Sequence, residues 1–297
     1  MKTSIDCLPC FLRQAMEVAK LTSSDVTMQG DIMKKALGFL SSADLDVPPP
    51  FLACLLHRRL REITGIPDPY RVVKDEHNKT ALNLLPEIRR KIAAAKDPLY
   101  AAVQFAIAAN IIDLGAKNGI NFLDIKSAFA KTSDEKIESE EGYKQFRRAA
   151  LSARNILFLA DNAGEIVFDR LLIEQLAPEK VTLVVRGKPV INDATRHDAE
   201  AAGLDEIMEI IDNGSDAPGT ILNECSPEFQ RRFAEADMII AKGQGNYEAL
   251  SDVARNIYFL FMIKCPVISA HSGFDVGAYV ATNRFPERNT PTERDTL

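Results

Sequence analysis

The sequence predicts an α/β protein in which an all-helical amino-terminal region precedes a three-layer α/β/α region with a mainly parallel sheet. Up to about residue 150, apolar residues recur every three or four positions, which is the period of amphipathic helices. From residue 151, short β-rich runs alternate with helical stretches, as in parallel strands joined by helical crossovers. A chain of 297 residues is long enough for two domains, which we expect at 1–150 and 151–297.

Proline and glycine divide the first region into separate helices. The VPPP run at 47–50 interrupts the apolar period, and a new helical pattern begins within it. The charged stretch 132–148 is interpreted as a solvated connection between the two regions. Helices are expected at 4–21, 24–40, 49–65 and 98–116.

The sequence pattern of the second region predicts strands and helices in strict alternation. Strands are expected at 155–160, 181–186, 206–211, 237–241 and 256–263, with a further apolar run at 265–269. Helices are expected at 166–177, 194–204, 226–236 and 246–254. Crossovers between parallel strands are right-handed, so these helices should cover both faces of the sheet.

Composition and charge exclude several classes of partner. Lys and Arg number 36 against 42 Asp and Glu, so the net charge of −6 gives no overall basic field for nucleic acid or anionic lipid. The longest nearly apolar run, 99–112, is shorter than the ~20 residues of a membrane span. The amino terminus lacks the apolar core of a secretory signal, and an odd count of five cysteines does not suggest a disulfide framework. We therefore expect a cytoplasmic protein with a small, diffusing substrate.

Polar side chains follow four of the expected strands at the point where each strand ends. Ligands of open parallel sheets bind beyond the carboxyl ends of the strands, so these residues should share one edge. The residues are Asp161 and Asn162 after the first strand, Gly187, Lys188, Asn192 and Asp193 after the second, Asp212 and Asn213 after the third, and Lys242 after the fourth.

The chemistry of this edge favours a hard divalent cation and a phosphate. Two aspartates and an asparagine, with neither Cys nor His among them, are ligands that suit Mg²⁺ or Mn²⁺ better than Zn²⁺. The small residues Ala163 and Gly164 precede a helix whose first N–H groups could receive a phosphate oxygen, and Lys242 could add a point charge. Such a site would transfer or hydrolyse a phosphoryl group, with either Asp161 or metal-bound water as the nucleophile.

Each of these residues also has a plainer interpretation. Asp161 and Asn162 could cap the helix that begins near residue 166, and Asp193 could cap the next one. The stretch GQG at 243–245 could be a simple turn after Lys242. It begins like a dinucleotide fingerprint, but Glu248 stands where the third glycine belongs. No P-loop pattern occurs, and a D-x-D-x-[TV] phosphatase would need an acid at position 163.

Five sequence motifs, in this order along the chain, resemble a known family. The amino-terminal Cys7-x-x-Cys10, ANIIDLGA at 109–116, DNAGE at 161–165, VINDAT at 190–195 and AKGQGNYE at 241–248 look like the DUF89 family of metal-dependent damage-control phosphatases. The CxxC motif is similar to that of the mainly prokaryotic and archaeal branch of this family. The resemblance implies a helical amino-terminal domain packed on a Rossmann-like α/β/α domain that carries the metal site.

The resemblance also implies roles for individual residues. Asp161, Asn162 and Asp193 would bind the divalent ion, and Asp161 and Asn162 would be catalytic. The resemblance also implies a second family lysine at Lys264, from the R-T-x-K pattern of the eukaryotic branch. The arginine and threonine of that pattern are missing here, so the substrate preference of the eukaryotic branch is not carried over to this chain. The expected substrate-binding residues are Gly164, Glu165, Lys242, Asn246, Asn110 and Asp113.

Asn110 and Asp113 would lie one turn apart on one face of a very apolar helix. They could line the cleft between the domains, or they could hydrogen-bond to neighbouring helices inside the core. The sequence leaves both open.

Cys7, Cys10, Cys54 and His57 raise a separate question. Their two spacings, C-x-x-C and C-x-x-H, form a possible Cys₃His zinc set. Both pairs lie in expected helices, where cysteine commonly packs as a small apolar residue. Core packing, zinc binding and redox chemistry all remain possible.

The leading hypothesis is a divalent-metal-dependent phosphatase that hydrolyses small phosphorylated metabolites, either sugar phosphates or damaged phosphometabolites. Its cofactor would be Mn²⁺ or Mg²⁺, with Co²⁺ or Ni²⁺ possible. One alternative is an S-adenosylmethionine-dependent methyltransferase in which Asp212 binds the ribose hydroxyls. Another is a non-enzymatic regulator that binds a metabolite. The oligomeric state is not predicted.

Overall fold

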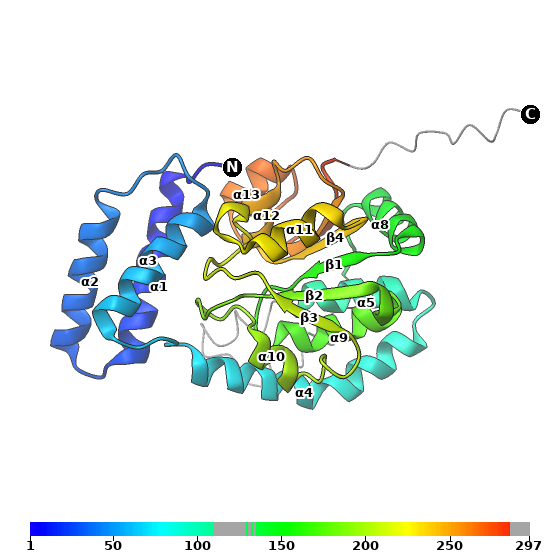
Figure 1. Ribbon diagram of the computed structural model, residues 1–297, viewed down its shortest axis with the longest axis horizontal. Coiled ribbons are helices and arrows are strands. Elements are labelled where there is room, and N and C mark those ends of the chain that lie inside the picture. The colour runs from blue at the N-terminus through cyan, green and yellow to red at the C-terminus, as the bar shows by residue number, and fades with distance from the viewer. Residues whose placement is uncertain (110–128, 130–131, 133–134, 286–297) are drawn as a thin grey trace, which may run out of the picture.

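A computed structural model describes residues 1–109, 129, 132 and 135–285 (Figure 1). The helices are α1 Leu8–Thr22, α2 Val26–Leu40, α3 Pro49–Thr64, α4 Arg71–Ala94, α5 Pro98–Ala108, α8 Glu140–Ser152, α9 Glu165–Gln175, α10 Arg196–Ala201, α11 Pro227–Glu235, α12 Gly243–Leu250 and α13 Pro266–Ser272. The strands are β1 Ile156–Leu159, β2 Val181–Val185, β3 Glu209–Asp212, β4 Met238–Lys242, β5 Ile257–Met262 and β6 Tyr279–Thr282.

Helix α3 shows how local sequence sets the boundaries. Pro49 and Pro50 occupy its first turn, where proline loses no intrahelical hydrogen bond. Gly65 ends the helix with φ of 70°, a left-handed conformation that glycine adopts without steric cost. At the other kind of helix end, Asp97 caps the amino terminus of α5, because its side chain accepts a hydrogen bond from the N–H of Tyr100.

The described strands form one sheet in the order β3-β2-β1-β4-β5-β6. β1 to β5 are parallel to one another, and β6 runs antiparallel to β5. The predicted α/β class with a mainly parallel sheet is thus confirmed, although β6 was not among the expected strands. The chain reverses its direction of travel across the sheet between β1 and β4, where doubly wound sheets bind their ligands.

The two faces of the sheet are buried under different helices. Alternate strand residues such as Phe158 and Ile240 pack with α4, α5, α8 and α9, whereas their neighbours Leu159 and Ile239 pack with residues of α11, α12 and α13. This alternation follows from the period of two in a strand, and it produces the three layers seen in Figure 1.

Helices α1 to α3 form a smaller unit with an apolar cluster of their own. In Figure 1 this unit lies beside the loops that leave the sheet, and two residues of the loop after β2, Val190 and Ile191, join its cluster. The domain boundary near residue 150 remains a prediction. The apolar clusters group α4, α5 and α8 with the sheet and leave α1 to α3 by themselves.

The interpretation of 132–148 as a solvated connection is wrong from residue 140 onward. Those residues begin α8, which is capped by Ser139 and packs against β6. Its charged side chains occupy one side, while Tyr143 and Phe146 are buried on the other. Two aromatic residues three positions apart thus define a buried helical face within a charged sequence.

None of the described helices combines the length and the apolar character needed to cross a bilayer.

Candidate active site

The candidate site lies where the strand order reverses. Asp161 and Asn162 follow β1, and Gly243 begins α12 directly after β4. Gly243 has φ of 77°, and a Cβ atom there would lie 1.9 Å from Oδ2 of Asp161. Only glycine therefore lets the first turn of α12 approach the Asp161 carboxylate so closely.

Asp193 is brought to the same place by backbone pairing. Residues Asn162 and Asp193 form an isolated antiparallel bridge. Around it, the N–H of Ala194 donates to the carbonyl of Asp161, and the N–H of Ala163 donates to the carbonyl of Asn192, both at 2.8 Å. The structure thus places Asp161, Asn162 and Asp193 together, and all three are buried.

Negative charge accumulates at this point. Burial raises the pKa of Asp161 well above its usual value, and the nearby charges of Glu165 and Asp193 raise it further. Lys264 and Arg186 act in the opposite direction without reversing the shift. A divalent cation would favour ionised Asp161 and offset this repulsion, so the charge and the oxygen donors both fit such an ion.

The amide of Asn162 has a defined orientation. Its Nδ2 donates to Oδ2 of Asp161 at 2.8 Å and to Oε2 of Glu165 at 3.1 Å. Since the nitrogen side of the amide faces the two carboxylates, Oδ1 is the atom that would serve as a metal ligand.

The plainer capping interpretations are wrong. The N-cap of α9 is Gly164, which has no side chain to accept a hydrogen bond, so neither Asp161 nor Asn162 caps that helix. The N-cap of α10 is Thr195, which forms a capping box with Asp198. Asp193 instead accepts from Nε of Arg186 at 2.7 Å.

Lys242 occupies an unexpected position. Its Nζ is fully buried and donates to Oε1 of Glu165 and Oδ1 of Asp169, both at 2.6 Å, and to the carbonyl of Ala106 at 2.9 Å. An ammonium group has three hydrogens, and these three bonds account for all of them. A direct contact of Lys242 with phosphate stays a prediction, and this geometry shows the lysine holding Glu165 instead.

The backbone N–H groups before α9 are also engaged. Gly164 donates to Oδ1 of Asn78 at 2.7 Å, and Ala163 donates to Asn192. These two groups are therefore not available for the phosphate contact that the sequence suggested. Gly164 itself fits tightly against α4, because a Cβ atom there would lie 3.0 Å from Cβ of His77.

Asn246 connects the site to the loop after β3. Its Nδ2 donates to the carbonyl of Lys242 at 2.7 Å, and its Oδ1 accepts from the hydroxyl of Thr220 at 2.8 Å. Arg186 lies within 3.4 Å of both Asn246 and Thr220 while its Nε holds Asp193. The expected substrate contact of Asn246 is untested, and its observed partners make it a structural link.

Three residues of the site were missed at the sequence level: Asn78, Asp169 and Arg186. Asp169 follows Glu165 by four positions and therefore shares its helical face, a signal that the sequence did contain. Arg186 directly follows the apolar strand β2, but no local pattern indicates that it pairs with Asp193. Asn110 and Asp113 lie outside the described residues.

The possible zinc set is not assembled as a metal centre. Within the described part of the chain, no three or more His, Cys, Asp or Glu side chains form a group suited to a metal ion. His57 contacts Oε1 of Gln14 at 3.2 Å, and the thiol of Cys54 contacts Asp216 at 3.5 Å. Burial raises the pKa of Cys54 to about 12, so its thiol stays protonated. The candidate site at Asp161 is of another kind, because its three proposed ligands are two carboxylates and the amide of Asn162.

The fold and this edge define a doubly wound α/β protein with a small helical unit beside its strand-end loops. The sequence model of the family described as the damage-control phosphatase ARMT1-like domain matches residues 3–280. The chain therefore belongs to this family, also known as DUF89. The predicted membership of the DUF89 family is confirmed, and the assignment to its CxxC-containing branch stays a prediction.

Archaeal relatives match over nearly the whole chain. A damage-control phosphatase of Archaeoglobus fulgidus is 36% identical over 289 residues, covering 95% of this chain and 99% of the relative. One of Pyrococcus horikoshii is 32% identical over 294 residues, covering 96% and 99%. The crystal structure of a DUF89 family protein from Pyrococcus horikoshii superposes with a TM-score of 0.87 at 30% identity, covering 95% of this chain and 99% of that one.

Proposed function

We propose that the protein is a divalent-metal-dependent phosphatase that hydrolyses small phosphorylated metabolites. The observation that carries the proposal is the meeting of Asp161, Asn162 and Asp193 at the reversal of strand order, with more carboxylate charge than the nearby cations offset. Membership of the damage-control phosphatase family and the names of its archaeal relatives support the reaction class.

Asp161, Asn162 and Asp193 would hold the cation through oxygen atoms. Mn²⁺ and Mg²⁺ suit such ligands, and Co²⁺ or Ni²⁺ could replace them. When bound, the ion would polarise the phosphoryl oxygens and favour attack by a water molecule or by Asp161.

The surrounding residues prepare this arrangement. Lys242 fixes Glu165, and Glu165 and Asp161 together orient the amide of Asn162. Arg186 holds the Asp193 carboxylate through a hydrogen bond from its Nε. The first turn of α12 begins against Asp161, so the positive end of that helix would favour a phosphate anion there.

The methyltransferase alternative receives no support from Asp212. Its Oδ1 accepts from the N–H of Gly214 at 2.9 Å, as in an ordinary turn after a strand. That alternative also leaves the paired Asp161 and Asn162 beside Asp193 without a use.

Asp161→Asn tests the proposal. The substitution removes one ligand charge, so Mn²⁺-dependent hydrolysis of p-nitrophenyl phosphate should fall by at least about 100-fold. The fold should persist, because the amide also relieves repulsion from Glu165 and Asp193, and circular dichroism will check this. Asp212→Asn makes the same chemical change at an exposed strand end and should keep full activity. Full activity in Asp161→Asn would refute the assignment. In a separate experiment, a screen of phosphate esters with the wild-type protein would identify its substrate.

A further inference from the structure

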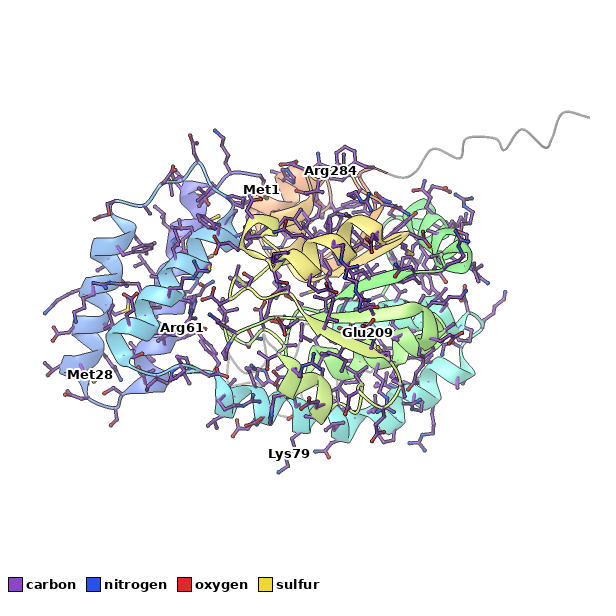
Figure 2. All side chains as sticks on the ribbon, viewed as in Figure 1. Met1, Met28, Arg61, Lys79, Glu209 and Arg284 are labelled. Carbon is purple, nitrogen blue, oxygen red and sulfur yellow. The ribbon has the colours of Figure 1, made fainter. Side chains whose placement is uncertain are left out.

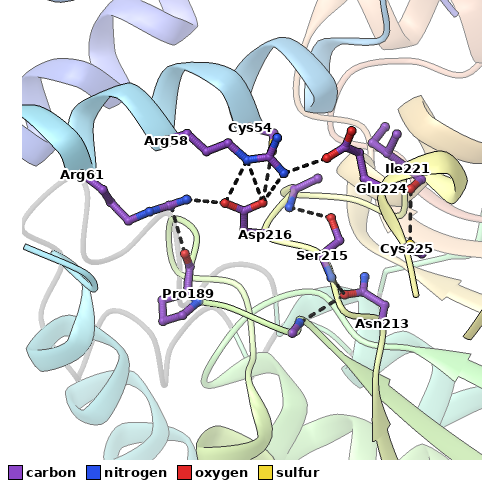
Figure 3. A network of polar contacts seen from close by, with 12 residues as sticks. Cys54, Arg58, Arg61, Pro189, Asn213, Ser215, Asp216, Ile221, Glu224 and Cys225 are labelled. Carbon is purple, nitrogen blue, oxygen red and sulfur yellow. Dashed lines mark hydrogen bonds and ion pairs between the residues drawn. The ribbon is translucent and has the colours of Figure 1, made fainter. Parts of the chain in front are cut away.

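Helix α3 is joined to the strand-end loops by a group of ion pairs that we name the α3 arginine network: Arg58, Arg61, Asp216 and Glu224 (Figure 3). Arg58 donates to both carboxylate oxygens of Asp216 and, at 2.7 Å, to Glu224. Arg61 donates to the other side of the Asp216 carboxylate. Figure 2 labels Arg61 between α3 and these loops.

Arg61 also reaches the loop that carries Asp193. Its second guanidinium nitrogen donates to the carbonyl of Pro189 at 3.1 Å. The same loop is tied to the loop after β3, because the N–H groups of Gly187 and Lys188 both donate to the carbonyl of Ser215. Arg61 thus contacts both loops at once, through Pro189 in one and Asp216 in the other.

The backbone of the Asp193 loop is strained at Ile191. This residue has φ of 42°, a left-handed conformation that is costly for a β-branched side chain. Ile191 is nevertheless buried, and with Val190 it packs into the apolar cluster of α1 to α3. A strained conformation persists only where its surroundings hold it, and here the surroundings are the α1–α3 unit.

Ile191 lies two residues before Asp193, and the N–H of Asp193 donates to the carbonyl of Val190 at 3.1 Å. The position of the Asp193 carboxylate therefore depends on how this short turn is held. Arg61 holds the loop on one side of Ile191, and the backbone bridge with Asn162 holds it on the other.

We propose that Arg61 is a positioning residue for the metal site. By binding Pro189 and Asp216 together, it keeps the strained turn at Ile191 in place and so presents Asp193 to the cation. This inference rests on the proposed function only in so far as Asp193 is a metal ligand. It makes the helical unit a contributor to metal affinity although none of its own side chains is among the proposed ligands.

The test compares Arg61→Met with Arg59→Met by titrating each metal-free protein with Mn²⁺ in a calorimeter. Methionine keeps much of the apolar stem while removing every hydrogen bond of Arg61. Arg59 is a matched control on the same helix, because its side chain is 54% exposed and pairs with the exposed Glu62 one turn away. Loss of outer contacts to metal ligands commonly weakens affinity by about 10- to 100-fold.

We expect Arg61→Met to raise the Kd for Mn²⁺ at least about 10-fold, with kcat at saturating Mn²⁺ changed less than about 3-fold. Arg59→Met should leave both unchanged. A merely structural role would lower the melting temperature of Arg61→Met without moving its Kd for Mn²⁺. An unchanged Kd, or an equal rise in Arg59→Met, would overturn the inference.

Two further variants cover the case in which Arg61→Met fails to fold. Arg61→Lys keeps the charge but can make fewer of the bonds, so its Kd should lie between those of the wild type and Asp216→Asn. A folded Asp216→Asn with wild-type affinity would also overturn the inference. If the wild type binds no Mn²⁺ the inference fails, whereas binding of Mn²⁺ without hydrolysis of any ester would remove only the proposed function.

Discussion

Two ion-pair networks flank the candidate site, and they differ in their contact with water. The Lys242 network, formed by Lys242, Glu165 and Asp169, is almost completely buried beneath the site. The α3 arginine network lies at the edge of the helical unit, where the side chain of Arg58 is 38% exposed. The first holds two carboxylates on one lysine, whereas the second balances two carboxylates with two arginines.

The carboxyl groups respond in opposite directions. Burial raises the pKa of Asp169 to about 7, because the burial effect outweighs the charge of Lys242, which acts to lower the pKa, and the charge of Glu165 adds to the rise. Burial also acts to raise the pKa of Asp216, but hydrogen bonds and charge from Arg58, together with the charge of Arg61, lower it overall. A dry cluster with excess negative charge thus holds a proton readily, while a balanced and partly solvated cluster stays ionised.

The largest effect is expected from Lys242→Met. The substitution removes a buried positive charge and its hydrogen bonds to the carboxylates of Glu165 and Asp169, which should destabilise the fold by about 3–5 kcal/mol. Urea unfolding at pH 7 measures the loss, and Lys188→Met, at an exposed loop position, is the control. A loss below about 1 kcal/mol would mean that water reaches this network. The contrast between a dry Lys242 network and a partly solvated α3 arginine network would then be wrong.

A second prediction concerns His57, which lies beside Arg61. Burial, with the charge of Arg61, lowers the pKa of His57 from 6.5 to about 3. Below pH 6.5 the unfolded chain binds a proton that the folded protein does not, so stability should fall as pH drops from about 6.5 toward 3. His57→Gln should flatten this part of the stability profile.

His197→Gln is the control for the pH prediction, since the side chain of His197 is 62% exposed. The same urea unfolding measurements between pH 4 and pH 7 show how the loss of an exposed imidazole changes the unfolding free energy, for comparison with the loss of the buried one. If the unfolding free energy of His57→Gln falls with pH as much as that of the wild type, the carboxylates and not this imidazole cause the loss of stability in acid.

The smallest effect is expected from Glu224→Gln. The pair of Glu224 with Arg58 is partly exposed, at 27% and 38%, and exposed pairs contribute at most about 1 kcal/mol. The unfolding free energy should therefore change by less than about 1 kcal/mol, in contrast to Lys242→Met. A loss comparable to that of Lys242→Met would place both networks in the same dry environment.

The sequence predicted the parallel strands well because each is a short apolar run whose character depends on neighbouring residues. It also predicted that Asp161, Asn162 and Asp193 would share an edge, since parallel strands connected by crossovers end on the same side. It did not predict β6 or α8. The apolar residues of α8 are sparse within a charged sequence, and their burial depends on the sheet that they cover.

The roles of the polar residues were harder to predict. Lys242 was expected at the phosphate because it follows a strand, yet its position at 0% exposure makes Glu165 and Asp169 its partners. The pairing of Arg186 with Asp193 is equally invisible in the sequence. Hydrogen bonds of this kind depend on distance and direction, which the spacing of residues along a strand does not provide.

Local residue order by itself determined the alternation of strands and helices and the polar residues that stand at each strand end, because both follow from periods of a few residues. Tertiary structure decided which of those residues meet the solvent, which are neutralised by a distant lysine or arginine, and how α3 reaches the Asp193 loop. The reason is physical: burial and pairing depend on groups far apart in the chain, and only the packed fold brings them within a few ångströms.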